Sequence, residues 1–265
     1  MIATPRDAAT LVLMRDIPGV GTKPEVLLLQ RHAHEAFAVG AYVFPGGMLE
    51  ADDTIPAALA LSRGVSPAAA IARLADATPA SQALGLWIAA LRETFEGTGI
   101  LLACYADGRF WEPSPAESVQ LAAQRRAMQQ GVTSFVNMMH DVERYLATEL
   151  LVYFAHWVTP EIRPLRFSTR FFLAQAPDRL TALPDAVEVV EQVWLTPEEA
   201  LQRHAKGDME MMTVTVKILQ ILSCFPSAAA AIEQLRDQPV ATVLPKAMRQ
   251  ADGSTRLLYP GDEGY

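Results

Sequence analysis

Short hydrophobic runs alternate with helical patterns along the whole chain. Apolar runs bounded by turn residues predict strands, whereas apolar residues three and four apart predict helices. Strands are expected over residues 10–16, 25–31, 41–44, 100–105, 149–159, 169–174 and 187–194. Helices are expected over residues 68–76, 81–95, 114–130, 134–146, 214–225 and 227–235, with a further helix starting at Thr196. The strand over 25–31 is apolar on both faces, which indicates a central position in a sheet.

Boundary signals support several of these helices. Ser66 and Pro67 can supply an N-cap and a first-turn proline. Gly99 is well placed as a C-terminal cap of the helix over 81–95. Residues 51–84 are rich in alanine, and we expect one or two short helices there, lying on the surface.

Two stretches that are far apart in the sequence carry the candidate chemistry. The first is a turn at Gly46 and Gly47, where glycine permits close approach of the backbone to a ligand. The second is the end of the helix over 81–95, where Glu93 and Glu96 share one helix face. Two such carboxylates repel each other unless they are solvated or bridged by a cation. Mg²⁺ accepts carboxylate oxygens and substrate phosphates, although an ordinary solvated helix face is the alternative.

These two stretches resemble the halves of a Nudix box. The matching residues are Gly47, then Asp53 in place of the first Glu, then Arg92, Glu93, Glu96, Gly99 and Ile100. There are two departures from the family pattern. The spacer between Asp53 and Arg92 is far longer, and Gly97 stands where the pattern has the second residue of a Glu-Glu pair.

The long spacer is similar to that of one Nudix branch, the peroxisomal coenzyme A diphosphatase and its bacterial relatives. Similar segments also occur at residues 27–31, 157–160, 166–172 and 188–194, so the resemblance extends over residues 8–205. It implies an α+β fold with a mixed β-sheet sandwiched between α-helices. We expect a single domain over residues 1–265, with a helical insertion at 51–84 and a C-terminal helical extension and tail at 207–265.

The resemblance also implies an activity. It predicts a metal-dependent hydrolase that cleaves a diphosphate linkage in a nucleoside diphosphate joined to another group, with coenzyme A or acyl-coenzyme A as first candidate. Mg²⁺ or Mn²⁺ would be held by Glu93, Glu96 and the Gly46 carbonyl. The base would be Glu93 or Glu191, and Asp53 would pair with Arg92.

Gly97 is the main difficulty for that prediction, because the residue it replaces is a principal metal ligand in the family. Three outcomes are open: another acid substitutes, activity persists at a low level, or the protein binds a nucleotide-type ligand without turnover. The acids considered as substitutes are Glu50, Asp52, Asp53, Glu188 and Glu191.

Three arginines are candidates for contacting substrate phosphate, because a guanidinium suits bidentate phosphate binding. Arg31 ends the strand over 25–31, and Arg166 and Arg170 lie at the start of the strand over 169–174. The alternatives are a solvated strand-end charge for Arg31 and pairing with nearby acids for the other two.

The composition limits the kinds of molecule that this protein is expected to bind. A formal charge of −8 argues against non-specific binding to nucleic acid or to an anionic membrane. The two cysteines are isolated, and no apolar run reaches membrane length. We therefore expect a cytoplasmic protein with a small-molecule diphosphate substrate, and a homodimer is left open.

Overall fold

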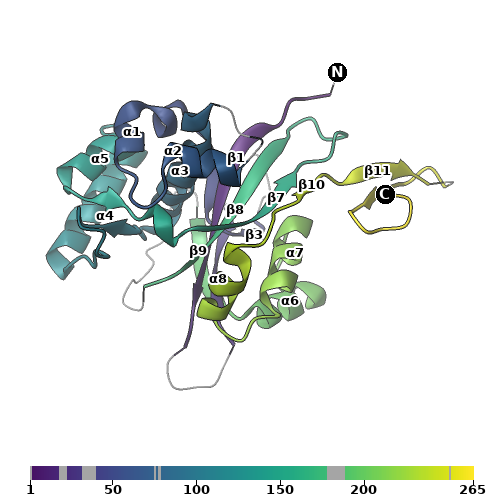
Figure 1. Ribbon diagram of the computed structural model, residues 1–265. Coiled ribbons are helices and arrows are strands. Elements are labelled where there is room, and N and C mark those ends of the chain that lie inside the picture. The colour runs from purple at the N-terminus through teal and green to yellow at the C-terminus, as the bar shows by residue number, and fades with distance from the viewer. Residues whose placement is uncertain are drawn as a thin grey trace.

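A mixed sheet lies at the centre of the computed structural model, which describes residues 2–17, 23–31, 40–74, 76, 79–177, 189–250 and 252–265. The strands of this sheet are β1 (Arg6–Arg15), β2 (Glu25–Arg31), β3 (Tyr42–Val43), β4 (Gly46–Met48), β7 (Val152–Val158), β8 (Phe167–Gln175), β9 (Val189–Leu195) and β10 (Thr242–Val243). Their order is β10-β7-β8-β1-β2-β3, with β4 paired to β1 and β9 paired to β2. Helices cover both faces of the sheet (Figure 1).

Strand β1 joins the two halves of the sheet. It pairs in parallel with β8, and antiparallel with β4 at its start and with β2 at its end. Its buried side chains alternate between two hydrophobic cores: Leu11 and Leu13 belong to one, and Val12 and Met14 to the other. This alternation follows from the two-residue period of a strand that is covered on both faces.

The first face is covered by the helices that include the insertion. They are the 3-10 helix η1 (Ala51–Thr54), α1 (Pro56–Ala60), α2 (Pro67–Arg73), α3 (Ala80–Thr98), α4 (Pro115–Gln129) and α5 (Phe135–Asp141). A short ladder of β5 (Ala103–Cys104) and β6 (Tyr145–Leu146) and the 3-10 helix η2 (Thr148–Leu150) complete this layer. Helix α3 packs on the sheet, and Gly99 ends it with a left-handed φ of 76°.

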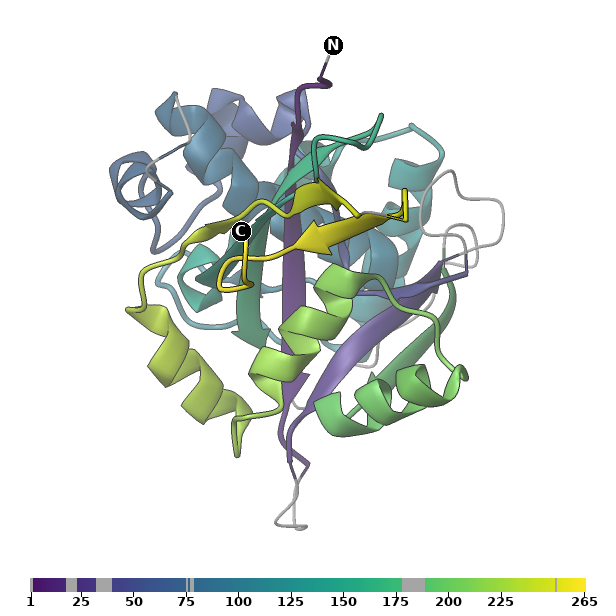
Figure 2. The ribbon, with the colours of Figure 1, turned by 90° about the vertical axis from the view of Figure 1, so that its right-hand side faces the viewer.

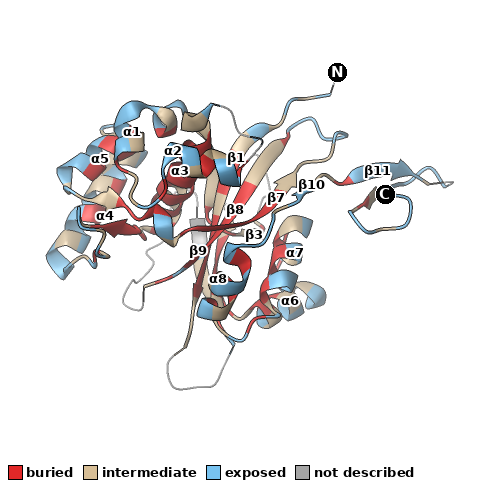
Figure 3. Ribbon diagram, in the orientation of Figure 1, coloured by how far each residue is buried: buried red, intermediate tan, exposed pale blue. Residues whose placement is uncertain are grey.

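The second face is covered by α6 (Pro197–Lys206), α7 (Thr213–Leu222) and α8 (Ala228–Arg236). Figure 2 shows α6 and α7 in front of β1 and β2, whereas α8 lies to one side and packs on β7 and β8. The chain then adds β10 to the sheet edge beside β7. It ends in a separate hairpin of β11 (Lys246–Arg249) and β12 (Thr255–Leu258). Buried residues concentrate along the sheet and on the helix sides turned toward it (Figure 3).

The predicted α+β sandwich is confirmed, and two local expectations are wrong. The strand expected over 100–105 is reduced to Ala103–Cys104, although its apolar residues are buried. The helix expected over 134–146 ends at Asp141, because the chain turns there into β6. The insertion forms the two short surface helices that were expected, α1 and α2, and buried residues such as Ala58 and Ala70 anchor them in the first core.

The described residues contain no helix that is both long and apolar enough to cross a bilayer.

Candidate active site

Arg92 is the centre of a cluster of carboxylates on α3. Its residue surface is only 4% exposed, so its guanidinium finds its partners inside the protein. Nε and Nη2 donate to the Asp53 carboxylate at 2.9 and 3.0 Å. Nη1 donates to Glu93 at 3.0 Å and to Glu96 at 3.1 Å, and Nη2 also donates to the Met48 carbonyl at 2.9 Å. These bonds use all five N–H donors of the guanidinium, which fixes three carboxylates relative to one another.

Asp53 reaches Arg92 because the start of the insertion turns back onto α3. Its carboxylate also accepts the Glu50 backbone N–H at 2.8 Å, and the Glu50 side chain accepts in return from Asp53 N–H. Gly85 on α3 permits this approach, since a Cβ there would lie 2.8 Å from Thr54 Cγ2. The Asp53–Arg92 ion pair expected from the sequence is therefore present, across 39 positions of the chain.

Glu93 is held in a space that Gly47 leaves open. A Cβ on Gly47 would overlap the Glu93 carboxyl carbon and both of its oxygens. Burial raises the pKa of Glu93 to about 7, partly offset by the Arg92 charge and raised further by Glu96. The pKa of Glu96 is also raised, first by burial. Glu93 is therefore poised to gain or lose a proton near neutral pH.

The Gly46 carbonyl points toward the same side as this cluster. The neighbouring residues Pro45 and Leu49 form hydrogen bonds with β1 through Leu11 N–H and Asp7 C=O, each at 2.9 Å. Carbonyls two residues apart in a strand point the same way, and the Met48 carbonyl accepts from Arg92. The Gly46 carbonyl, two residues earlier, is accordingly directed away from β1.

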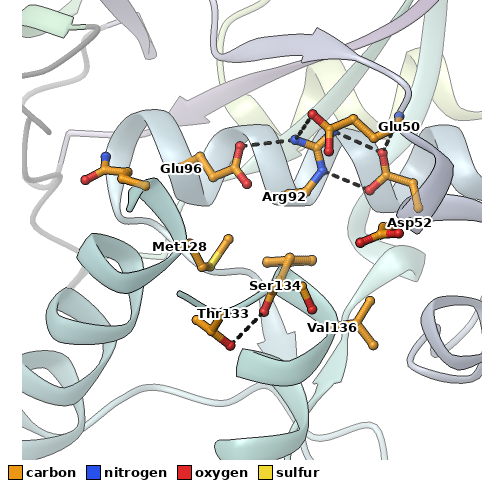
Figure 4. Close-up of a pocket in the computed structure, with 11 residues that line it drawn as sticks. Glu50, Asp52, Arg92, Glu96, Met128, Thr133, Ser134 and Val136 are labelled. Carbon is orange, nitrogen blue, oxygen red and sulfur yellow. Dashed lines mark hydrogen bonds and ion pairs between the residues drawn. The ribbon is translucent and has the colours of Figure 1, made fainter. Parts of the chain in front are cut away.

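A cavity of about 390 Å³ opens beside the cluster, between α3 and the segment that joins α4 to α5. In Figure 4, Arg92 and Glu96 lie on α3, across the cavity from Met128 of α4 and from Thr133 and Ser134 of that segment. The lining residues are Glu50, Asp52, Asp53, Arg92, Glu96, Met128, Gln129, Thr133, Ser134, Phe135 and Val136. One wall is therefore acidic, and the facing wall combines hydroxyl groups with apolar side chains.

The wall from α4 and α5 was not anticipated from the sequence. The signals in the sequence were Gly131 and Ser134, which mark a turn between two helices. In the structure Gly131 has a left-handed φ of 68° and Ser134 is the N-cap of α5. They do not say that this turn faces the acidic cluster, because that depends on how α4 and α5 pack beside α3.

Residues 62–216, more than half of the chain, match the family model described as NUDT19 Nudix domain. The chain belongs to this Nudix family. It is 29% identical to the acyl-coenzyme A diphosphatase NUDT19 of Gallus gallus over 98% of this chain and 79% of that protein. The Homo sapiens protein of the same name is 29% identical over 91% of this chain and 72% of that protein.

A solved structure supports the same fold. The crystal structure of a NUDIX hydrolase from Alicyclobacillus acidocaldarius has a TM-score of 0.69 and 26% identity, and the match covers 90% of this chain and 100% of that chain. The mixed sheet between two helical layers is thus a Nudix fold, and the split box lies where the fold places Gly47 beside Glu93.

Nudix hydrolases in general require a divalent cation, and the donors present fit one. Arg92 binds only Oε1 of Glu93 and Oε2 of Glu96, which leaves one oxygen of each carboxylate without a bond to the guanidinium. Carboxylate and carbonyl oxygens are the donors that hard cations prefer. However, no three His, Cys, Asp or Glu side chains of the described ranges already converge as a metal cage. A cation would therefore rely on Glu93, Glu96 and the Gly46 carbonyl.

Gly97 leaves a real gap in this Nudix site. A Cβ at this position would meet only Leu29 Cδ1, at 3.3 Å. A side chain here would point to the sheet side of α3, one helical turn after Glu93, and Leu29 would have to shift by a few tenths of an ångström to admit it. The backbone conformation does not require glycine at position 97, so the fold itself does not exclude a carboxylate there.

Arg166 and Arg170 are both bound by protein oxygens in the fold. Arg166 is buried and donates to the backbone carbonyls of Thr159 at 2.9 Å and Ala3 at 2.7 Å. Arg170 is buried and pairs with Asp7 and, at 2.7 Å, with Asp76. Each guanidinium is already bound by protein oxygens, which favours pairing within the protein over contact with substrate.

Arg31 lies in a different environment from those two. It is the last residue of β2, on the face that Leu27 and Leu29 turn toward the core under α3. The structure therefore places it on the α3 side of the sheet, at the end of a strand adjacent to β9.

Glu191 lies away from the cluster. It is exposed, and its carboxylate accepts from the Tyr42 hydroxyl at 2.9 Å. The next residue, Gln192, donates to the Gly97 carbonyl at 3.1 Å. Adjacent strand residues face opposite sides, so Glu191 projects from the face opposite α3 and is poorly placed as ligand or base. Glu188 lies outside the described residues.

Proposed function

We propose that this protein is a divalent-cation-dependent hydrolase of diphosphate linkages, with coenzyme A or acyl-coenzyme A as the first candidate substrate. The observation that carries the proposal is the Arg92 cluster, in which Asp53, Glu93 and Glu96 come together across a long insertion. The relatives named acyl-coenzyme A diphosphatase support the choice of substrate.

The cation, Mg²⁺ or Mn²⁺, would be held by Glu93, Glu96 and the Gly46 carbonyl. When bound, it supplies Lewis-acid polarisation of a phosphoryl oxygen and a lowered pKa of water. Arg92 holds one oxygen of each glutamate, so the two carboxylates keep a fixed separation during the reaction. We assign the base to Glu93, because the other candidate, Glu191, projects from the face of the sheet opposite α3.

The cavity between α3 and α5 offers a place for the rest of the substrate. Glu96 lies on its acidic wall, so a cation there would bring the diphosphate to this end. Met128, Phe135 and Val136 form an apolar surface on the opposite wall, suited to an organic group. Arg31 stays the proposed phosphate-contacting arginine.

The finer expectations about context are also proposals. The charge of −8 supports a protein that works apart from nucleic acid. Its location in the cytoplasm stays a prediction. The single-domain organisation over residues 1–265 is supported by one sheet that both hydrophobic cores share. A homodimer stays a prediction.

A second function, binding without catalysis, is favoured by one observation, the absence of a carboxylate at Gly97. A site with only two box carboxylates would hold a cation more weakly, and the protein would then bind a nucleotide-type ligand without turnover.

The test is hydrolysis of a panel of diphosphates by the full chain with Mg²⁺ or Mn²⁺ and with chelator. The panel contains coenzyme A, acyl-coenzyme A, NADH, ADP-ribose and nucleoside triphosphates. We expect metal-dependent release of two phosphate monoesters from coenzyme A, abolished in Glu93→Gln. Silence across the panel from a folded protein would favour the binding function. A large rate gain in Gly97→Glu would then show that the site lacks only this carboxylate.

A further inference from the structure

Gln192 carries a buried oxygen that nothing in the described structure satisfies. It lies in β9, and its Nε2 donates to the Gly97 carbonyl at 3.1 Å. Its Oε1 is buried and has no hydrogen-bond partner among the described residues. A buried acceptor without a hydrogen bond is unfavourable and rare in folded proteins, so such an atom calls for a ligand or another role.

The position of this oxygen relates it to the missing carboxylate. Residues three and four along a helix lie on either side of the first, so Glu96 and Gly97 flank Glu93. Glu96 turns to the cavity side, whereas Gly97 faces Leu29 of β2 and Gln192 of β9. The Gln192 amide therefore lies at the flank of Glu93 from which the box residue at position 97 is absent.

We propose that Gln192 Oε1 contributes to the metal site the oxygen that Gly97 cannot supply, either to the cation or to a water bound to it. The inference rests on the proposed function, because it needs a divalent cation at Glu93. Amide oxygens are suitable donors for Mg²⁺ and Mn²⁺. The hydrogen bond from Nε2 to the Gly97 carbonyl holds the amide beside position 97, where the carboxylate of the box is absent.

The alternative is a purely structural role, in which Gln192 only ties β9 to α3. Two substitutions separate these roles. Gln192→Leu removes both the oxygen and the N–H donor at similar volume. Gln192→Glu removes the donor to Gly97 but keeps an oxygen and adds charge. A structural tie predicts that both variants behave alike, whereas an oxygen ligand predicts opposite effects on the metal.

The readout is the Mn²⁺ dissociation constant of the full chain, measured by electron paramagnetic resonance near pH 8, with thermal unfolding in chelator as folding control. We expect Gln192→Leu to weaken Mn²⁺ binding by about tenfold and Gln192→Glu to bind at least as tightly as the unaltered protein. In a Gly97→Glu background the effect of Gln192→Leu should disappear, because the restored carboxylate takes that place.

Two results would overturn the inference in distinguishable ways. If the unaltered protein binds Mn²⁺ and Glu96→Gln weakens it, but Gln192→Leu does not, the proposed function stands and Gln192 is only a tie. The same conclusion follows if both Gln192 variants lose affinity equally. If the unaltered protein binds no Mn²⁺ at all, both the metal site and the role of Gln192 are refuted.

Discussion

Replacing Gly47 with alanine tests whether the position of Glu93 matters for activity. The added methyl would overlap the Glu93 carboxylate, whereas ordinary contact begins at 3.4 Å. The Glu93 carboxylate is the end of a flexible side chain on α3, so it can move aside while the backbone of β4 stays paired with β1. The substitution should therefore displace one carboxylate without breaking the fold.

The size of the displacement sets the expected effect. To reach ordinary contact the carboxylate must retreat by roughly 1 Å, and a misplacement of about that size can lower a rate by about 10²-fold. This corresponds to about 2.7 kcal/mol of transition-state stabilisation. The stability of the fold should change by less than about 1 kcal/mol, because the obstacle is a movable side chain and not packed backbone.

The assay is kcat/KM for metal-dependent coenzyme A hydrolysis, with thermal unfolding measured in parallel. Gly97→Ala is the matched control, because its Cβ meets only Leu29 and a helical glycine-to-alanine change favours the helix by up to about 1 kcal/mol. We expect unaltered kinetics and equal or higher stability for this control. If Gly47→Ala stays folded and keeps its activity, the assignment of Glu93 to the reaction is refuted. If it unfolds, the expectation that Glu93 gives way without cost to the fold is refuted instead.

Three further predictions concern charge. In the metal-free folded protein, burial raises the pKa of Glu93 to about 7 from its ordinary value of 4.5. Between these two pH values the folded protein therefore keeps a proton that the unfolded chain has lost. Stability without metal should therefore fall as pH rises through this window, and Mn²⁺ affinity should rise about tenfold per pH unit and level off above pH 7; a flat profile would contradict the assignment. Arg92→Met should destabilise the protein by about 3–5 kcal/mol in urea unfolding at pH 8, and by less at pH 5, where Glu93 is protonated; an equal loss at both pH values would argue against the carboxylate cluster as the cause. Arg170→Gln should lower stability by about 1–3 kcal/mol and leave KM unchanged, since Arg170 binds Asp7 and Asp76; a higher KM at unchanged stability would instead indicate substrate contact.

Local signals were sufficient for many elements of this fold. The apolar run at Glu25–Arg31 forms a strand with the expected bounds, because its apolar residues are buried on both faces. Ser66 caps α2 by accepting from Ala69 N–H, as the Ser-Pro pair predicts. Such features depend on contacts a few residues away, which the sequence displays directly.

Long-range partners could not be predicted in the same way. Arg166 and Arg170 were candidates for phosphate contact because a guanidinium suits bidentate phosphate binding. Their partners in the structure come from the N-terminal segment and from the segment after α2, at Ala3, Asp7 and Asp76. The parallel pairing of β1 with β8 brings the N-terminal segment beside both arginines, and no local signal in the sequence indicates that pairing.

The candidate metal site shows the same limit for two neighbouring residues, Glu191 and Gln192. A motif in β9 draws attention to Glu191, because a carboxylate is the expected substitute for a missing carboxylate. The face that each residue presents is decided by the pairing of β9 with β2 and by α3 above them. That register turns Gln192 toward Gly97 and Glu191 toward Tyr42. When a Nudix box lacks one glutamate, the side chains that the neighbouring strand turns toward that position decide whether another group can replace the carboxylate. Here the group on β9 is an amide oxygen with no hydrogen-bond partner in the described structure.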